Sequence, residues 1–183
     1  MVKEQDTLIF FDIITTELGD MLVAFKNDYS LIAIFLPANN SSDSIKYLKL
    51  LIEKKGLPEP IEKEYYLYRN VFIDYFKGKE VPLSKLKYDI NFFNPTNFQK
   101  DVWKTCKEIP YSSTKTYRDI ALELDKKCFR SVGVALGKNN LPILIPCHRV
   151  VSKNGIGGFS GNGGISMKKK LLALENPNFP KTI

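Results

Sequence analysis

Residues 94–97, Asn-Pro-Thr-Asn, separate two parts of the chain whose sequence patterns differ. Proline stops a regular element, and Thr96 or Asn97 is suited to cap a helix that follows. Strand-like segments dominate before this point, and short helical segments dominate after it. A chain of 183 residues can form one large domain or two small ones. We therefore expect a boundary near residue 90, with domains at residues 1–90 and 91–183.

The first domain is predicted to be an α/β domain with a small antiparallel sheet and helices. Three apolar, β-prone segments predict strands, and the polar residues between the second and third predict a hairpin. Apolar residues at helical spacing predict two helices after the strands. The strands are expected at residues 7–13, 21–25 and 31–36, a turn at 15–20, the helices at about 43–55 and 61–76, and an extended segment at 81–94.

Aromatic residues form a stripe along the second of these helices. We interpret the stripe as core rather than as a platform for stacking bases, because helical periodicity is the commoner cause of such a pattern. Its aromatic members are Tyr65, Tyr68, Phe72, Tyr75 and Phe76.

The second domain is predicted to be mainly helical. A first helix covers residues 98–106 and ends before Pro110, and a turn at 111–115 follows. A second helix at 116–124, which Thr116 is suited to cap, is joined by residues 125–127 to a third at 128–138. Two short helices joined by about three residues, the second basic and rich in small residues, are typical of a helix-turn-helix.

Charge is distributed unequally between the two parts. Residues 1–90 carry 12 Lys and Arg against 14 Asp and Glu, a net charge of −2, whereas residues 91–183 carry 15 against 6, a net charge of +9. A strongly basic second half favours a polyanionic partner such as nucleic acid. The alternative is a solvated lysine surface, which charge alone leaves open.

Several classes of protein and site are disfavoured. The apolar run at 31–36 is too short to span a bilayer, and residues 1–6 do not form a signal peptide, so we expect a cytoplasmic protein that does not bind membranes. Three cysteines do not make a disulfide framework in an intracellular chain. One histidine and no Cys-x-x-Cys pair argue against zinc, so we expect no metal and no cofactor.

Residues 145–150, Ile-Pro-Cys-His-Arg-Val, contain the strongest chemical signal. They join the only histidine of the chain, His148, to Cys147 and Arg149. A cysteine fixed by proline and flanked by cationic or hydrogen-bonding groups is typical of a thiol whose pKa is lowered for nucleophilic attack. The pattern therefore indicates a reactive cysteine rather than a packing one.

Motifs over about residues 72–175 resemble the O6-alkylguanine-DNA alkyltransferase family. The resemblance is most specific at Pro146-Cys147-His148-Arg149 and is loose in the first half. The other matching segments are Tyr75 to Gly78, Phe98-Gln99, Val102-Trp103, Ile109 to Tyr111, Thr116-Tyr117, Ile120-Ala121, Arg130 to Gly133, Asn139, Pro142, Gly157 to Gly161 and Leu171 to Glu175.

The resemblance implies a ribonuclease-H-like first domain and a winged-helix-like helix-turn-helix second domain. It implies a monomeric repair protein that acts on double-stranded DNA carrying O6-alkylguanine, flips the damaged base out of the duplex and moves its alkyl group irreversibly to Cys147. Repair of O4-alkylthymine is left open. Because the product is a thioether that water does not readily cleave, each molecule is expected to act once.

The resemblance also assigns roles around the acceptor. His148 would take the thiol proton through a bridging water, with Glu175 orienting its ring. Tyr117 would donate its phenolic hydrogen to the extruded base. Arg130 would enter the duplex in place of the flipped guanine, and Gly133 would let the helix approach the DNA backbone closely.

A further group of residues is expected to support the site. Asn139 would tie the turn before Pro142 to the active loop, and Ser131 would contact DNA. Val150, Phe159 and Ser160 are expected to line the base pocket. Arg149 is expected to pair with a carboxylate or carbonyl groups, Cys106 to lie in the core, and Cys128 to be partly exposed without a catalytic role.

Three positions depart from the family pattern. Ser112 stands where glycine is usual, and Phe159 stands where tyrosine is common. The segment 161–164, Gly-Asn-Gly-Gly, is longer than usual and is expected to loosen the loop after Ser160. None of these changes removes a group that the transfer requires.

Three other functions fit parts of the pattern less well. An alkyltransferase-like protein that only binds lesions would lack the acceptor, and Cys147 is present. A cysteine hydrolase usually takes its histidine from a distant part of the chain and has no use for a basic helix-turn-helix. A transcription factor would leave the cysteine motif without a function.

Overall fold

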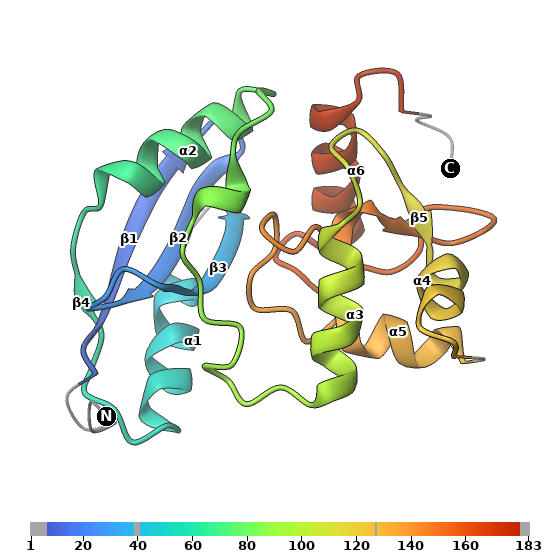
Figure 1. Cartoon of the computed structure of the whole chain (residues 1–183). Coiled ribbons are helices and arrows are strands. Elements are labelled where there is room, and N and C mark those ends of the chain that lie inside the picture. Colours follow the sequence, from blue (N-terminus) through green and yellow to red (C-terminus); the bar gives the residue numbers. More distant parts are fainter. Residues whose placement is uncertain (1–6, 39–40, 127, 180–183) are drawn as a thin grey trace.

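The computed structural model describes residues 7–38, 41–126 and 128–179 (Figure 1). Residues 1–6, which bear on the expected lack of a signal peptide, and Lys127 in the predicted helix connection lie outside the described residues. No helix within the described ranges combines the length and apolar character that crossing a membrane requires.

A four-stranded sheet forms the first part of the molecule. Strands β1 (Ile9–Thr16), β2 (Gly19–Lys26) and β3 (Leu31–Ala38) are antiparallel neighbours, which confirms the three predicted strands. Strands β1 and β2 continue into the predicted turn, so that only Glu17 and Leu18 separate them.

The expectation of a purely antiparallel sheet is wrong at one edge. Strand β4 (Ile61–Glu62) pairs with β1 in parallel, and the strand order is β3-β2-β1-β4. A strand that joins a sheet in parallel needs a long crossover connection. The segment between β3 and β4, which contains helix α1 (Ser42–Glu53), provides it.

Helix α2 (Tyr66–Phe76) begins five residues later than predicted. Residues 61–62 are used by β4, and the buried Asp12 then fixes where the helix starts. Its carboxylate accepts the backbone N–H of Tyr65 at 2.9 Å and a two-pronged contact from Arg69 at 2.6 and 2.9 Å. The side chain of a distant strand thus serves as the N-terminal cap.

The two faces of the sheet are covered by different elements. Alternate side chains of β1 and β2 point to opposite faces, so Phe11 and Leu22 pack with Leu48 of α1, whereas Val23 packs with Phe72 of α2. The cluster that contains Phe72 continues without interruption into the second half of the chain, where its members include Val102, Trp103, Ile120, Val132 and Leu144. The two halves therefore share one core.

The connecting segment 81–94 is not simply extended as predicted. It contains the 3-10 helix η2 (Leu83–Lys85) and a turn before Asn94, and only Tyr88 forms a bridge to β3. Pro82 precedes η2 and has no N–H for a ladder, which favours the tight turn over a strand.

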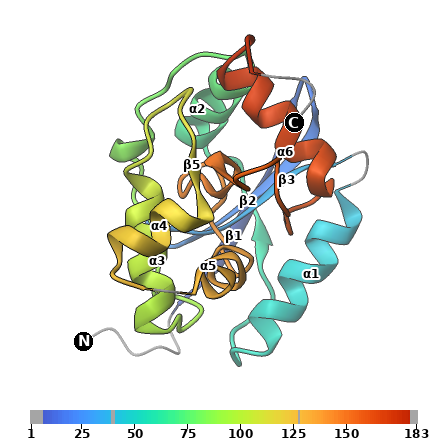
Figure 2. The ribbon, with the colours of Figure 1, turned by 90° about the vertical axis from the view of Figure 1, so that its right-hand side faces the viewer.

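Helices α3 (Asn97–Lys107), α4 (Tyr117–Glu123) and α5 (Phe129–Leu136) confirm the three helices predicted for the second half. Thr96 and Thr116 form capping boxes with Gln99 and Asp119, which confirms both as N-caps. The three helices pack together on the side of the molecule away from the sheet (Figure 1), and α5 is seen nearly end-on in Figure 2.

The remaining elements carry the cysteine motif. They are the short parallel pair β5 (Lys115–Thr116) and β6 (Val150–Val151), the 3-10 helix η3 (Cys147–Arg149) and the final helix α6 (Gly164–Glu175). The loop that leads to η3 is attached to the sheet, because the N–H of Ile34 in β3 donates to the carbonyl of Asn140 at 2.8 Å. The sheet thus supports the loop that holds Cys147.

Candidate active site

Cys147 lies at a cavity of about 560 Å³ on the side of the molecule formed by α4 and α5. It is the first residue of η3, directly after Pro146, and its side chain is partly buried. The other residues that line the cavity are Tyr117, Phe129, Arg130, Gly133, Val134, Leu136, Gly137, Gly158, Phe159 and Ser160. Five side chains predicted for the site from sequence (Tyr117, Arg130, Phe159, Ser160 and Cys147) therefore meet here.

Two residues predicted to line the base pocket or to contact DNA do not line this cavity. Val150 is fully buried, its N–H donates to the carbonyl of Cys147, and its carbonyl accepts a hydrogen bond from Lys168. Ser131 is not among the lining residues, and its hydroxyl donates to the carbonyl of Cys128 at 2.6 Å. On α5 the cavity is thus lined from the other helix face, by Arg130 and Gly133.

Asn139 fixes the position of the thiol. Its side-chain amide donates to the carbonyl of Ile145 at 2.8 Å and contacts Cys147 Sγ at 3.3 Å, while its carbonyl oxygen accepts the N–H of Leu141. One side chain thus joins both ends of the loop 139–147 to the sulfur. This geometry agrees with the supporting role that the resemblance implies.

The resting thiol keeps its proton. Burial raises the pKa of the Cys147 thiol above its usual value, although the Asn139 hydrogen bond and the Lys168 ammonium act in the opposite direction. Desolvation outweighs both of these favourable interactions. A reaction at this sulfur therefore requires that its proton leaves as the new bond forms.

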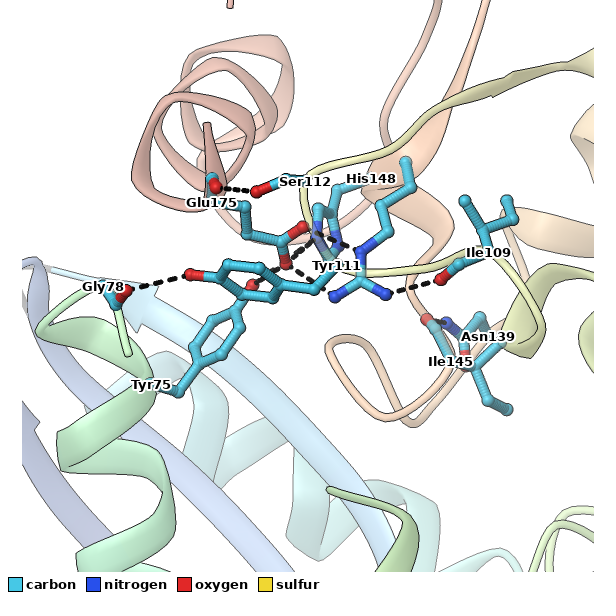
Figure 3. A network of polar contacts seen from close by, with 10 residues as sticks. Tyr75, Gly78, Ile109, Tyr111, Ser112, Asn139, Ile145, His148 and Glu175 are labelled. Carbon is cyan, nitrogen blue, oxygen red and sulfur yellow. Dashed lines mark hydrogen bonds and ion pairs between the residues drawn. The ribbon is translucent and has the colours of Figure 1, made fainter. Parts of the chain in front are cut away.

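His148, the residue after Cys147, forms a buried pair with Glu175 (Figure 3). The Nε2 atom of His148 lies 2.8 Å from Oε1 of Glu175, and both side chains are almost completely buried. Burial lowers the pKa of His148, so its ring is neutral near pH 7. A neutral imidazole beside a carboxylate carries its hydrogen on the nitrogen that faces the carboxylate, here Nε2.

The second ring nitrogen of His148 is consequently a proton acceptor. This Nδ1 atom is buried and has no hydrogen-bond partner among the described residues. A buried acceptor without a protein partner, on the residue next to a protonated thiol, is suited to receive the thiol proton through one water. Together these groups have the chemistry that a general base requires.

Arg149 and Tyr75 complete the environment of the carboxylate. The Arg149 guanidinium donates to Oε2 and Oε1 of Glu175 at 2.7 and 2.9 Å and to the carbonyl of Ile109 at 2.7 Å. The hydroxyl of Tyr75, from α2, donates to Oε1 at 2.6 Å. Burial alone would raise the pKa of Glu175, but hydrogen bonds from His148 and Arg149 lower it to about 2.

Tyr75 was expected only as a core residue. It is indeed fully buried, but its hydroxyl joins α2 of the first half to Glu175 at the end of α6. A periodic aromatic stripe gives no signal for such a contact, because the partner lies 100 residues away in sequence. Arg149, by contrast, has the carboxylate and carbonyl partners expected from sequence.

Tyr117 forms one wall of the cavity. Burial raises the pKa of its phenol, so the group stays protonated and can donate, and in the structure it donates to the carbonyl of Gly158 at 3.1 Å. Lys168, which the sequence did not single out, is fully buried behind it. Its Nζ donates to the carbonyls of Val150 and Gly158 and lies 5.6 Å from the centre of the Tyr117 ring.

The pKa of Lys168 lies close to neutral pH. Burial lowers the pKa of the ammonium to about 8. Its two hydrogen bonds join the carbonyl of Val150, which directly follows η3, to the carbonyl of Gly158, which belongs to the cavity wall. Only the fold could reveal this residue, because Lys168 lies in a run of three lysines of which the other two are exposed.

Gly157 is required by the position of Tyr117. Its φ is +72°, and a Cβ atom there would lie 2.8 Å from the Tyr117 ring and 3.1 Å from the N–H nitrogen of Ser152. We expect Gly157→Ala to lower the free energy of unfolding by about 1–3 kcal/mol and to displace the tyrosine. Denaturant unfolding measures this, with Gly56→Ala as the control, because Gly56 also has a positive φ but has open space around it. Equal losses in the two variants would show that backbone strain alone acts.

Two of the three departures from the family pattern have structural explanations. Ser112 has a φ of +61°, a left-handed conformation that favours glycine and costs other residues about 1–2 kcal/mol. Its hydroxyl donates to the backbone carbonyl of Glu175, which offsets part of that cost. The loop after Ser160 is not simply loose, because Asn162 donates to Ser44 of α1 at 3.2 Å.

Comparisons with known proteins agree with this geometry. The family model described as the DNA-binding domain of 6-O-methylguanine DNA methyltransferase matches residues 97–177. A methylated-DNA–protein-cysteine methyltransferase of Methanosarcina barkeri is 32% identical over 178 residues, which cover 93% of this chain and 99% of that protein. The chain belongs to the methylated-DNA–protein-cysteine methyltransferase family. The resemblance found in the sequence is confirmed.

Solved structures of this family share the fold. The O6-methylguanine-DNA methyltransferase of Pyrococcus kodakaraensis superimposes with a TM-score of 0.72 at 27% identity, covering 91% of this chain and 99% of that one. The Mycobacterium tuberculosis protein OGT in complex with DNA gives a TM-score of 0.70 at 26% identity, covering 94% and 96%. A small sheet with helices joined to a helical second half is thus the fold of the family.

Proposed function

We propose that the protein moves the alkyl group from O6 of guanine in double-stranded DNA to Sγ of Cys147. The observation that carries this proposal is the position of one thiol, held by Asn139, at a cavity that Tyr117 and Arg130 also line. The names of the relatives, which are methylated-DNA–protein-cysteine methyltransferases, and the DNA bound to the M. tuberculosis relative support the same reaction.

The residues of the site account for each bond and each proton in this reaction. The sulfur forms a bond to the alkyl carbon, the bond between that carbon and O6 breaks, and its electron pair goes to the guanine. The thiol proton passes through water to Nδ1 of His148, and Glu175 stabilises the imidazolium that results. The phenol of Tyr117 gives its hydrogen to the guanine, which departs as a neutral base.

Access to the sulfur requires that the base leaves the helix. The reacting carbon of a paired guanine lies within the duplex, whereas Cys147 lies at a cavity in the protein. The nucleotide must therefore rotate into the cavity, and the exposed Arg130 at the start of α5 would occupy the space it leaves. Helices α4 and α5, as a winged-helix-like helix-turn-helix, would hold the DNA.

The remaining features of the proposal follow the family. The sheet would be the ribonuclease-H-like domain, with the boundary near residue 90. The protein would act as a cytoplasmic monomer that requires no metal or cofactor. O4-alkylthymine would be a further substrate only if the cavity admits the smaller pyrimidine with its alkyl carbon at Sγ.

Mass spectrometry of the intact chain after incubation with O6-methylguanine duplex tests the reaction. We expect one added methyl group, located on Cys147 after proteolysis. With protein limiting, the methyl groups removed from DNA should reach one equivalent and stop, because a thioether resists hydrolysis. Transfer well beyond one equivalent, or an unmodified Cys147 in folded protein that has met an excess of the lesion, would refute the proposal.

A further inference from the structure

An exposed phenylalanine lies beside Arg130 at the start of α5. Phe129 is the first residue of the helix, 53% of its surface is exposed, and it lines the cavity that contains Cys147. Large apolar side chains in this protein are mostly buried, so an aromatic ring in water at the mouth of a reactive cavity needs an explanation.

Phe129 belongs to one face of the helix. The α5 residues that line the cavity are Phe129, Arg130, Gly133, Val134 and Leu136, and Gly137 follows just after the helix. The first four recur at helical spacing and are not buried, while Leu136 lies at the buried edge of the cavity and Val132 and Ala135 turn their side chains into the core. Val134 is also exposed, at 67%. Two apolar side chains therefore flank the arginine on the exposed face.

The charge of the second half of the chain favours one kind of partner for this face. The second half of the chain carries a net charge of +9, and Arg130 lies within the face itself. A basic surface opposes contact with a second copy of the same chain and attracts the phosphate backbone of DNA. An apolar side chain that enters the minor groove between base steps is a known way to unstack and bend a duplex.

We propose that Phe129 is a wedge that stacks against a base adjoining the extruded nucleotide while Arg130 fills the space that this nucleotide leaves. The inference rests on the proposed function, since it needs a flipped base. Extrusion leaves the neighbouring bases without a stacking partner, and an aromatic ring at the first position of α5 can replace it without any hydrogen bond to a base. Phe129 is thus a positioning residue and does not touch the reacting atoms.

The distinction between duplex and single strand gives the test. We expect Phe129→Ala to slow methyl transfer from O6-methylguanine in duplex DNA about tenfold more than transfer from the same oligonucleotide as a single strand, where no pair must be opened. Phe129→Trp keeps a stacking surface and should restore most of the duplex rate. With 2-aminopurine in the place of the lesion base, where its fluorescence rises when it leaves the stack, binding of Phe129→Ala should raise the fluorescence less than binding of the unchanged protein does.

Tyr66→Ala provides the matched control. Tyr66 is an aromatic residue at the first position of α2, is 78% exposed and lies outside the cavity, so its loss should leave both rates unchanged. Sedimentation of the unchanged protein and of Phe129→Ala, without DNA, reports any association through this face.

The outcomes separate this inference from the proposed function. If the unchanged protein takes a methyl group onto Cys147 and Phe129→Ala has the same ratio of duplex to single-strand rates, the role of Phe129 as a wedge is wrong. The proposed function then stands. If the unchanged protein forms a dimer without DNA and Phe129→Ala is a monomer, this face binds a second copy of the chain. The role of Phe129 as a wedge is then also wrong. If the unchanged protein takes no methyl group from either substrate, the proposed function fails first.

Discussion

Cys147→Ala should abolish methyl transfer from O6-methylguanine DNA and leave duplex affinity within about twofold of the unchanged protein. Alanine has no nucleophile, so no thioether can form. The loop should keep its shape, because the Asn139 amide retains its bond to the carbonyl of Ile145 and its bond from the N–H of Leu141. Mass spectrometry measures transfer, and fluorescence anisotropy with a lesion-bearing duplex measures binding.

Cys128→Ala is the matched control for this variant. Cys128 is an exposed cysteine that precedes α5 and lies outside the lining of the cavity, so its loss should leave one methyl group on Cys147. A methyl group on Cys128 or Cys106 in the Cys147→Ala variant would contradict the assignment of the acceptor. Loss of binding with loss of transfer would instead show that the sulfur supports the fold.

Glu175→Gln should cost about 3 kcal/mol of stability and reduce the rate of transfer at least tenfold. The side chain is 1% exposed and is held by His148, Arg149 and Tyr75. A neutral amide leaves the buried guanidinium of Arg149 without its counter-charge, and breaking a buried ion pair from one side is strongly destabilising. The amide also no longer fixes the hydrogen of His148 on Nε2, which disturbs the proton acceptor.

Thermal unfolding measures the loss of stability. In a protein of this size 3 kcal/mol corresponds to a fall in Tm of about 10 °C. Asp74→Asn is the control, because Asp74 forms an exposed ion pair with Lys79 at 2.9 Å and such pairs contribute about 0–1 kcal/mol. If Glu175→Gln lowers the Tm no more than Asp74→Asn does, the structural role of the buried carboxylate is contradicted.

The same carboxylate makes stability depend on acidic pH. The pKa of Glu175 falls from 4.5 to about 2 in the folded protein, so the folded state binds its proton more weakly than the unfolded state does. Its contribution, about 3 kcal/mol, is complete above pH 4.5 and is lost as the pH falls from about 4.5 to about 2. Denaturant unfolding at pH 6 and pH 3 measures this dependence. Between these two pH values the free energy of unfolding should fall less for Glu175→Gln than for the unchanged protein.

The sequence by itself identified the elements and residues whose signals are local. The three strands of alternating or apolar character and the capping threonines Thr96 and Thr116 were predicted correctly because each signal lies within a few residues of the chain. The Pro-Cys-His-Arg motif, an equally local signal, carried the family resemblance. The family resemblance then named Asn139 and Glu175, which the structure places on Cys147 and His148 respectively.

The tertiary structure decided the features that depend on distant neighbours. The start of α2 depends on Asp12 from another strand, and the parallel edge strand depends on a crossover. Tyr75 and Lys168 resemble an ordinary core residue and a surface lysine until the fold brings them to Glu175 and Tyr117.

The protonation state of the site also required the fold. A cationic setting around Cys147 could be inferred from sequence, but the degree of burial could not, and burial is what raises the pKa of the thiol. The physical reason is that side-chain chemistry and short-range spacing are written along the chain, whereas desolvation and long-range hydrogen bonds arise only when separate segments pack together.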